Sequence, residues 1–496
     1  MNAPASPALA RLLDHAADAV AGVREGRSLT DLLARVPEAM RPGTQALAFH
    51  ALRRLGSATE VRAHLAPKTP PPAVDALLLT ALALLWPEEG RDAATATPYP
   101  DHTLVDQAVA AARHRTPAAA AFINAVLRRF TRERAQCMAA ARHAPLGAYN
   151  HPPWWIERVR QDWPAHWQAL LQEANRRPPM TLRVNARRAT AAAYVERLAR
   201  HGIEAHLVPP PAQWPAGLPW HAVRLAEPRG VMQLPGFADG EVSVQDEAAQ
   251  RAAPLLLGGG AAVPGSALPP LPRLAAGARV LDACAAPGGK AAHLLELADL
   301  DLLALDVDAQ RLARVHDNFK RLQLIDRPGA PAVRVAAGDA RRPADWWDGR
   351  PFDAILLDAP CTASGIVRRH PDVRWLRRPA DIDTLARVQA QMLEALWPLL
   401  APGGRMLYAT CSLFKAEGAH QIDAFLQRLG PAAARWRPES PGHLLPLADN
   451  ETARESGATA MSAMSATVSP KAATADGFFY ALIEKDPSPQ VHVPGR

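Results

Sequence analysis

The second half of the chain alternates short apolar runs with longer stretches that have helical spacing, such as Ala309 to Leu324 and Asp381 to Leu400. Short apolar runs bounded by turn residues are typical of buried strands. Their alternation with helices predicts an α/β fold with a doubly wound parallel sheet. The expected strands are Arg279–Leu281, Leu302–Asp308, Val333–Asp339, Asp353–Leu357 and Met406–Ala409.

Polar residues lie where these expected strands end. Asp306, Asp339 and Asp358 close three of the runs, and Cys361 and Cys411 follow the last two. Doubly wound sheets bind their ligands outside the carboxyl ends of the strands. The sequence therefore predicts a ligand site at this edge of the sheet.

A glycine turn follows the first expected strand, in the stretch from Ala278 to Lys290 that reads ARVLDACAAPGGK. Gly288 and Gly289 allow positive φ angles and close approach of a ligand, and a helix behind them would offer unpaired N–H groups. The turn matches neither GxGxxG nor GxxxxGK[ST], so neither a pyrophosphate nor a triphosphate is indicated. Asp306, about twenty residues further on, occupies the position where a carboxylate binds ribose hydroxyls. An ordinary strand–helix turn remains the alternative for this stretch taken alone.

The first 145 residues have helical spacing throughout and predict an all-helical domain. The last expected helix begins after Thr116 with a proline at its first position, and Arg128 and Arg129 lie on or near its apolar face. A solvated basic face is the alternative to an RNA-binding role. The expected helices are Pro7–Val23, Leu29–Ala34, Gly43–Leu55, Ala73–Trp86, Asp101–Ala112 and Pro117–Arg142.

Two further domains are expected after the helical one. Residues 149–249 predict a small α/β unit, with a strand at Met180–Asn185 and a helix at Ala191–His201. Residues 250–485 would hold the large sheet. The tract 447–475, rich in Ser, Thr and Ala, predicts a disordered insertion, after which Asp476–Leu482 resembles a final strand.

The composition indicates a basic surface for a partner and a protein that stays reduced. The net charge is +7, and only six of the 56 basic residues are lysine. Arginine suits contact with phosphates and bases, although such a composition also arises from codon bias. The four cysteines are widely spaced and match no zinc pattern. We therefore expect a reduced, cytoplasmic protein with reactive thiols and no metal. No signal peptide and no membrane span are expected, because the longest apolar stretch is too short.

The order of the strand-end motifs resembles one family. DACAAPGGK, LDVD, GDA, LDAPCTASGIVRRHPDVRW and YATCSLFKAEG look like successive motifs of the RNA (cytosine-5)-methyltransferases. The closest resemblance is to the bacterial 16S rRNA enzymes of the Sun/Fmu (RsmB) type. Two cysteine motifs on neighbouring strand ends are a stronger signal than either alone. The resemblance also covers the N-terminal half, where FINAVLRRF is similar to the family's NusB-like RNA-binding domain.

The resemblance implies a Rossmann-like catalytic domain and S-adenosyl-L-methionine as methyl donor. Asp306 would bind the ribose hydroxyls, and Asp339 the adenine region. Asp358 would contact the donor or the edge of the base. The methionine and ribose part would be wrapped by Cys284, Ala285, Ala286, Pro287, Gly288, Gly289 and Lys290.

The chemistry requires a thiolate, because C5 of cytosine is a poor nucleophile until a thiolate adds to C6. DNA cytosine-5 methyltransferases use the cysteine of a Pro-Cys motif, here Cys361, whereas the RNA enzymes use the later Thr-Cys motif, here Cys411. The resemblance assigns Cys411 as the nucleophile and Cys361 to product release. Small buried hydrophobic residues are the alternative for both. The family often has Asn after Glu417, where this chain has Gly418, which puts the local hydrogen bonding in doubt.

The partner implied by the resemblance is 16S ribosomal RNA, bound by a monomer. The expected RNA contacts are Arg128, Arg129, Arg183, Arg368, Arg369 and Arg374. Methylation of tRNA or of another rRNA site is an alternative within the same class. A non-catalytic RNA-binding factor of ribosome assembly, with a relic donor pocket, is the alternative outside it.

Overall fold

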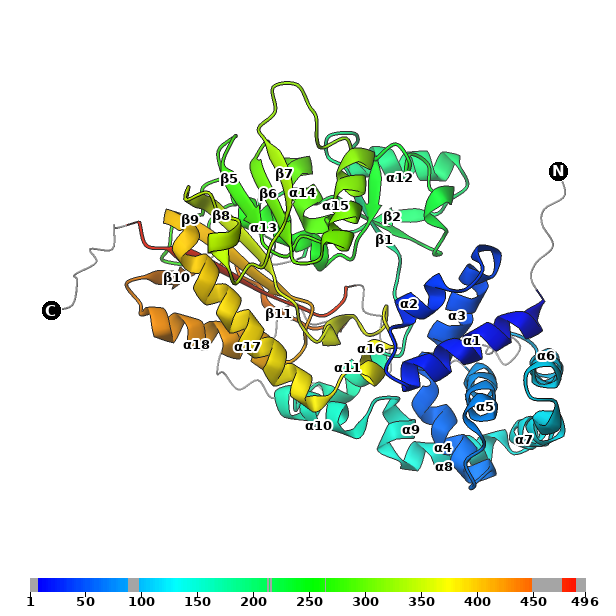
Figure 1. Cartoon of the computed structure of the whole chain (residues 1–496). Helices are drawn as coiled ribbons and strands as arrows, with labels where there is room; N and C mark the ends of the chain where they lie inside the picture. Colours follow the sequence, from blue (N-terminus) through cyan, green and yellow to red (C-terminus); the bar gives the residue numbers. More distant parts are fainter. Residues whose placement is uncertain are drawn as a thin grey trace. The chain divides into compact units, whose positions relative to one another are not determined.

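The computed structural model describes residues 8–87, 98–211, 214, 216–263, 265–447 and 475–487. The chain divides into two compact units (Figure 1). One consists of residues 1–177 with 367–379, and the other of residues 178–366 with 380–496. The tract expected to be a disordered insertion lies outside the described residues, apart from its two ends.

The helical unit contains most of the helices predicted for the first 145 residues, with three differences. The stretch expected as one helix from Pro117 is broken at Glu133, and a helix that the sequence did not predict follows α3. The helices α10 and α11, which lie in the range expected for the second domain, also belong to this unit. Its helices are α1 (Leu9–Arg24), α2 (Leu29–Ala34), α3 (Arg41–Arg53), α4 (Leu55–Leu65), α5 (Pro72–Leu84), α6 (Asp101–Arg115), α7 (Ala120–Arg132), α8 (Arg134–His143), α9 (Pro145–Tyr149), α10 (Pro153–Asp162), α11 (Trp167–Glu173) and α16 (Val373–Leu376).

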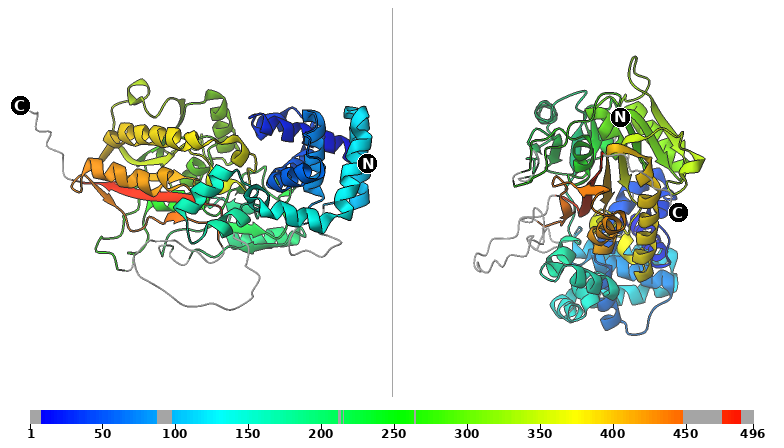
Figure 2. Two further views of the ribbon diagram at one scale, coloured as in Figure 1. Left: turned by 90° about the horizontal axis from the view of Figure 1, so that it is seen from below. Right: turned by 90° about the vertical axis from the view of Figure 1, so that its left-hand side faces the viewer.

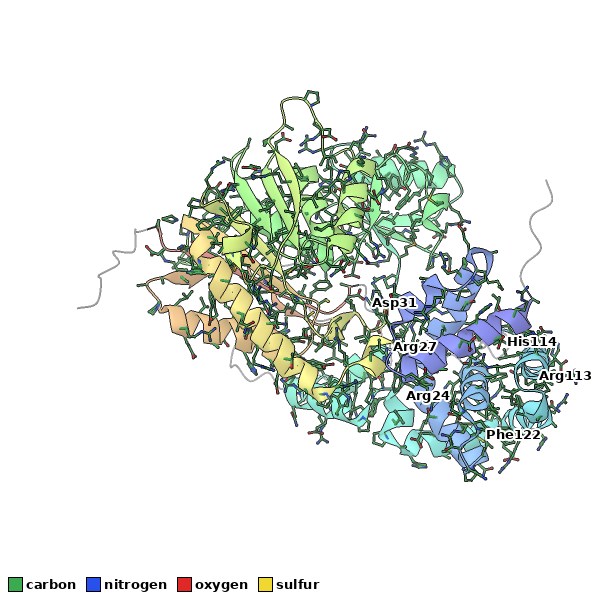
Figure 3. The ribbon with its side chains drawn as sticks, in the orientation of Figure 1. Arg24, Arg27, Asp31, Arg113, His114 and Phe122 are labelled. Atoms are coloured by element: carbon green, nitrogen blue, oxygen red, sulfur yellow. The ribbon has the colours of Figure 1, made fainter. Side chains whose placement is uncertain are left out.

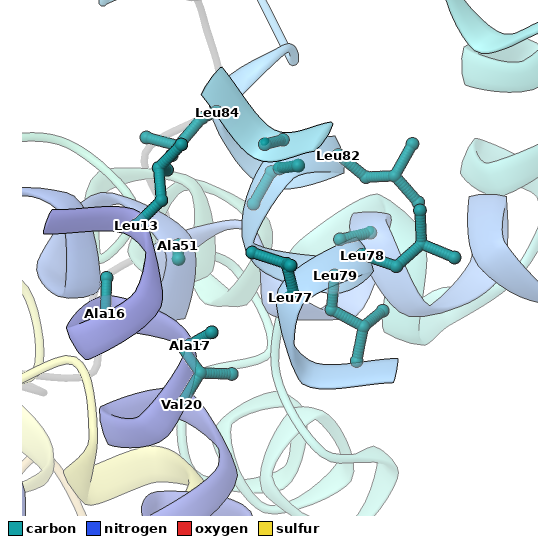
Figure 4. Packing of buried hydrophobic residues seen from close by; sticks show 14 of the residues in the cluster. Leu13, Ala16, Ala17, Val20, Ala51, Leu77, Leu78, Leu79, Leu82 and Leu84 are labelled. Carbon is teal, nitrogen blue, oxygen red and sulfur yellow. The ribbon is translucent and has the colours of Figure 1, made fainter. Parts of the chain in front are cut away.

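The helix α5 forms the centre of the helical unit. All its residues from Val74 to Leu84 are buried, which is expected of a helix that is apolar on every side. Leucines of α5 pack with Leu13 and Val20 of α1 (Figure 4). The one buried acid of α5, Asp75, is paired with Arg24 at 2.9 Å and with Arg62 at 3.1 Å. The core therefore needs α1, α4 and α5 together.

A small antiparallel sheet begins the second unit, with the strand order β2-β3-β1-β4. Leu182 and Val184 of β1 and Val223 of β3 pack against Tyr194 and Leu198 of α12, so one face of this sheet is covered. The elements are β1 (Thr181–Val184), α12 (Ala191–Arg200), β2 (Ala205–Leu207), β3 (Ala222–Leu225) and β4 (Val242–Val244).

The large sheet has the strand order β10-β12-β9-β8-β5-β6-β7, with β11 paired to β12. The strands β5 to β9 run parallel, and β12 is antiparallel to β9. The five predicted parallel strands are therefore present. The strands are β5 (Arg279–Asp282), β6 (Asp301–Asp306), β7 (Val333–Ala337), β8 (Phe352–Asp358), β9 (Leu400–Thr410), β10 (Ala434–Trp436), β11 (Gly442–Leu444) and β12 (Phe478–Lys485).

Helices cover both faces of the large sheet (Figures 1 and 2). Alternate strand residues point to opposite faces, so Val280 packs toward one layer of helices and Leu281 toward the other. The first layer is formed by α13 (Ala252–Leu257), α14 (Gly289–Leu297) and α15 (Ala309–Arg321), and the second by α17 (Pro379–Leu396) and α18 (Ala419–Leu429). Burial on both faces explains why the strands are continuous apolar runs, and the predicted doubly wound α/β class is confirmed.

Candidate active site

Polar residues lie at the carboxyl ends of four neighbouring strands. Asp282 ends β5, Asp306 ends β6, Asp358 ends β8 and Thr410 ends β9. The strand order reverses at β5, because β6 lies on one side of it and β8 on the other. Ligands of doubly wound sheets bind at such a switch point. The topology therefore brings the glycine turn and both cysteine motifs to one edge of the sheet.

The glycine turn is held in place by main-chain groups and by Asp306. Gly288, at φ +96°, immediately precedes α14, and a Cβ there would lie 3.2 Å from the Cα of Val315. The carboxylate of Asp306 accepts from the N–H of Ala286 at 3.0 Å and from that of Asp308 at 3.0 Å. Asn318 donates to the carbonyl of Pro287 at 2.9 Å. The turn is thus held by hydrogen bonds to the main-chain groups of Ala286 and Pro287.

Asp282 is a site residue to which the sequence reasoning gave no role. Its side chain is buried, and Oδ1 has no hydrogen-bond partner among the described residues. Burial, with the neighbouring Asp358, raises the pKa of Asp282 to about 7. Burial and the same two acids raise the pKa of the Cys284 thiol well above its usual range. A buried acid with an unused oxygen suits a cationic ligand group.

Lys290 links the glycine turn to the end of β8. Its Nζ lies 2.5 Å from Oδ2 of Asp358 and 5.4 Å from the centre of the Phe478 ring. Burial alone would lower the pKa of Lys290, but the carboxylate of Asp358 outweighs it and the net shift is upward. The ammonium group is therefore charged at neutral pH, and it interacts with Cys411 as well.

The two cysteines predicted to act together are in contact. Sγ of Cys361 lies 3.4 Å from Sγ of Cys411, a hydrogen-bonding distance for sulfur. The hydrogen bond with Cys411, and then burial, raise the pKa of Cys361 well above its usual range. Cys361 is thus held as a protonated thiol, whereas a thiolate is the form that attacks. Cys137, for which the sequence indicates a structural role, is buried in the core of the helical unit.

Two more residues near this edge of the sheet were not among the site residues predicted from the sequence. Glu417 is fully buried beneath the cysteine motifs, where the sequence left the hydrogen bonding in doubt. Val307, directly after Asp306, is 71% exposed, which is unusual for a valine between a strand and a helix.

Asp339, expected near adenine, follows β7 and pairs with Arg341 at 2.7 Å. That hydrogen bond lowers the pKa of Asp339.

Three arginines expected to contact RNA are buried, which corrects that prediction. Arg183 pairs with Glu296 at 2.7 Å and donates to the carbonyl of Gly289 at 2.8 Å. Arg368 pairs with Glu173 at 3.0 Å. Arg374 donates to the carbonyl of Ala174 at 2.6 Å. Burial and partners within the protein make these guanidinium groups anchors of the fold, since a phosphate would have to displace an existing ion pair or hydrogen bond.

The segment 367–379 explains why sequence reasoning misjudged two of these arginines. It follows the Pro-Cys motif in the chain, yet it packs in the helical unit. Arg53 donates to the carbonyl of Arg368 at 2.6 Å, and the indole of Trp375 donates to the carbonyl of Leu52 at 2.9 Å. The sequence shows basic and aromatic residues, as an RNA surface would, but cannot show that they face a protein core.

The remaining arginines differ in exposure. Arg128 and Arg129 are exposed on α7. Arg128 donates to Asn124 of the same helix at 2.9 Å, and Arg129 donates to Glu133, the residue after its end, at 2.9 Å. Arg369 is partly buried. The two arginines of α7 are therefore accessible to a large polyanion.

Comparison with known proteins agrees with this geometry. The family model described as 16S rRNA methyltransferase RsmB/F matches residues 272–484, and a ferredoxin-like domain described for the same proteins matches residues 151–219. Ribosomal RNA small subunit methyltransferase B of Pseudomonas putida is 41% identical over 83% of this chain and 88% of its own length. The protein of that name from Xanthomonas campestris pv. campestris is 44% identical over 78% of this chain and 77% of its own length.

A solved structure supports the fold over nearly the whole chain. The crystal structure of PH0851 superimposes with a TM-score of 0.65, at 23% identity, over 98% of this chain and 100% of that one. Among the described residues, no helix is both long and apolar enough to cross a membrane. The level of identity and the coverage confirm the resemblance seen in the motifs, and the chain belongs to the RsmB/F family of 16S rRNA methyltransferases.

Proposed function

We propose that this protein methylates C5 of a cytosine in 16S ribosomal RNA, with S-adenosyl-L-methionine as donor and a covalent bond from Cys411 to C6 of the base. The observation that carries the proposal is the pair of thiols of Cys361 and Cys411, 3.4 Å apart. They lie on neighbouring strand ends beside the glycine turn.

The residues at the switch point fit the donor. The orphan oxygen of buried Asp282 suits the ammonium of the methionine part, and Asp306 has carboxylate oxygens for ribose hydroxyls. The turn 284–290 would wrap the donor, because the glycine at its end leaves no side chain in the way. The exposed Val307 offers an apolar surface to the face of the adenine, and Asp339 would bound the adenine region. When bound, the donor supplies a methyl group on a sulfonium, which is a strong electrophile.

Cys411 is assigned as the nucleophile. Its thiolate adds to C6, and the electron pair displaced onto C5 makes that carbon nucleophilic. The charged ammonium of Lys290 interacts electrostatically with Cys411. Cys361 is a poor candidate for attack, because its hydrogen bond to Cys411 and its burial hold it as a thiol. The protonated state of Cys361 supports the RNA-type assignment over the DNA-type one.

Release requires two events after the methyl group has reached C5. The C5 proton must leave, and its bonding electrons must re-form the C5–C6 double bond so that the C6–S bond breaks and the Cys411 thiolate departs. Cys361 lies at contact distance from Cys411, so we assign it to this step. Asp358, beside Lys290, would contact the N3/N4 edge of the cytosine and stabilise the ring while it is bonded to sulfur.

The RNA surface is proposed on the helical unit. Arg128 and Arg129 of α7 are exposed, and Phe122 near the start of α7 is 39% exposed. Arg113 and His114, at the end of α6, are exposed on the same unit (Figure 3). Cationic side chains with an accessible ring suit phosphates and unstacked bases. The target cytosine must be unstacked to admit both thiol and donor.

The test is methylation of purified 16S rRNA with a donor labelled in the methyl group, followed by nucleoside analysis. Label in 5-methylcytidine is expected. Label in tRNA alone would favour the same chemistry on the alternative substrate. Donor binding with no transfer to any RNA would favour a non-catalytic assembly factor, and label in another nucleoside would overturn the proposal.

A further inference from the structure

A buried carboxylate lies between the two cysteine motifs. Glu417, at the end of the short helical turn Lys415–Glu417, is 0% exposed. Its Oε1 accepts from the main-chain N–H of Thr362 at 2.8 Å and from the amide of Gln389 at 3.3 Å. Its Oε2 accepts from the hydroxyl of Thr362 at 2.5 Å and from that of Ser412 at 2.6 Å. Both oxygens are thus used, and four donors converge on one side chain.

The partners of Glu417 lie next to the two cysteines. Thr362 directly follows Cys361, and Ser412 directly follows Cys411. The carboxylate of Glu417 therefore binds the residue after each thiol. Thr362 lies in the loop that follows β8, and Ser412 lies in the loop that follows β9. The carbonyl of Glu417 also accepts from the hydroxyl of Tyr408 at 2.8 Å, which ties the carboxylate to β9 itself.

Further polar contacts join the same two loops. Ser364 and Ser412 lie 3.0 Å apart through their hydroxyls, and Ser364 accepts from the N–H of Leu413 at 2.8 Å. The N–H of Gly365 donates to the carbonyl of Cys411 at 2.9 Å. The side chain of Glu417 contacts both loops, through the N–H and the hydroxyl of Thr362 on one and the hydroxyl of Ser412 on the other. Two of its donors, the N–H of Thr362 and the amide of Gln389, are obligate because neither can accept a hydrogen bond.

A charged group in this position is costly unless it has a role that an apolar side chain cannot fill. Burial raises the pKa of Glu417, while the hydrogen bonds from Ser412, Thr362 and Gln389 oppose that shift. Apolar packing would hold two loops together at lower cost in desolvation. Hydrogen bonds, however, fix direction and distance, which is what the placement of two thiols requires.

We propose that Glu417 is a positioning residue that sets the separation and the orientation of the thiols of Cys361 and Cys411. The inference rests on the two-cysteine chemistry proposed above and names what organises it. Glu417 does not touch the substrate or the donor. It acts through Thr362 and Ser412, and its negative charge also helps to keep Cys361 protonated.

The experiment compares Glu417→Ala and Glu417→Gln with the parent protein. Glutamine has the same shape and keeps an oxygen for the two obligate donors, while the two hydroxyls can turn to accept from its amide. It should therefore restore most of what alanine removes. The matched control is Asp75→Asn, which removes a buried acid from the helical unit and leaves the cysteine motifs untouched.

Two readouts separate thiol placement from activity. The first is single-turnover methyl transfer together with donor affinity by calorimetry. The second is bridging by phenylarsine oxide, whose arsenic forms bonds to two thiol sulfurs and whose oxygen leaves as water with the two thiol protons. Such a bridge forms only where two thiols lie close together, and Cys361→Ala gives the unbridged reference.

In Glu417→Ala, we expect methyl transfer to fall about a hundredfold, the loss typical of a misplacement of about 1 Å, with donor affinity unchanged and arsenical bridging weakened. Glu417→Gln should lie between this variant and the parent, and Asp75→Asn should match the parent per folded molecule. Unchanged bridging in both Glu417 variants would overturn the proposal, whatever the rate. If Glu417→Ala does not fold, the glutamine variant decides by the same two readouts.

Failure of the proposed function has a different signature. If the parent protein makes no 5-methylcytosine but arsenical bridging still depends on Glu417, the positioning role stands and the assigned chemistry fails. If methylation proceeds and bridging does not depend on Glu417, the chemistry stands and the positioning role fails.

Discussion

Nζ of Lys290, the second residue of α14, lies 2.5 Å from Oδ2 of Asp358, the last residue of β8. The pair joins the turn that would hold the donor to the strand that leads into the Pro-Cys motif. Asp358 raises the pKa of Lys290 against the opposing effect of burial, so the ammonium remains charged beside Cys411. This one contact therefore connects the donor side of the site to its thiol side.

Replacing Lys290 by methionine should slow methyl transfer more than it weakens donor binding. The variant keeps a long side chain but leaves Asp358 without its cation and Cys411 without a nearby positive charge. A charge-assisted hydrogen bond contributes about 1.5–3 kcal/mol, which corresponds to about a ten- to hundredfold loss of rate. Single-turnover rates and calorimetry on Lys290→Met and Lys290→Arg check this. An equal loss in rate and in donor affinity would instead make Lys290 a donor-binding residue only.

Asp306→Ala should weaken donor affinity about ten- to hundredfold, the loss of about 1.5–3 kcal/mol from a charge-assisted contact. Two effects combine in this variant, because Asp306 would bind the ribose and also accepts from the N–H groups of Ala286 and Asp308. Asp308→Ala is the control, since it removes a neighbouring acid that caps α15 through Gln310. Unaltered donor affinity by calorimetry would remove Asp306 from the site.

The donor-free protein should lose stability between about pH 4 and pH 7 because of Asp282. Its pKa is raised to about 7 in the folded state, so the folded protein holds a proton that the unfolded chain releases near pH 4. The contribution of Asp282 to the free energy of unfolding is fully present below the pKa that this group has in the unfolded chain. It is lost as the pH rises through about 7, the pKa in the folded state. Integrated over about three units, it is on the order of 4 kcal/mol. Denaturant unfolding of Asp282→Asn should show a flatter pH dependence, and identical curves for the two proteins would contradict the prediction.

Substitution of the exposed arginines should affect RNA binding, whereas substitution of a buried arginine should affect stability. Arg128→Ala with Arg129→Ala should weaken RNA binding and reduce the slope of its salt dependence by roughly one to two units, with unchanged stability. Arg374→Ala should lower the free energy of unfolding by at least about 2 kcal/mol, because it leaves buried carbonyls without donors. Filter-binding titrations at several salt concentrations and denaturant melts measure the two effects. Equal salt slopes for the α7 variant and the parent would place the RNA surface elsewhere.

Much of the fold could be predicted because local signals agree with it. Parallel strands buried on both faces leave continuous apolar runs, and the polar residue after each run marks its carboxyl end. This signal alone predicts that Asp306, Asp358, Cys361 and Cys411 lie at one edge of the sheet. The topology then decides which of those ends are neighbours.

The parts that the sequence did not predict depend on contacts between distant residues. Arg368 and Arg374 look like an RNA surface because nothing local shows that they pack against Glu173 and Ala174. The role of Glu417 depends on Thr362, which is 55 positions away in the chain. The long helix expected from Pro117 is divided at Glu133 although the apolar pattern continues, so spacing alone gave the wrong end.

The most direct test of the account is covalent trapping with the two cysteine variants. Each variant is incubated with 16S rRNA and donor and then analysed by denaturing electrophoresis. Cys361→Ala should attack and transfer the methyl group but release slowly, so a protein–RNA adduct that depends on the donor should accumulate. Cys411→Ala should give neither adduct nor product. An adduct from Cys411→Ala with none from Cys361→Ala would reverse the two roles, and two folded variants without any adduct would contradict the covalent mechanism itself.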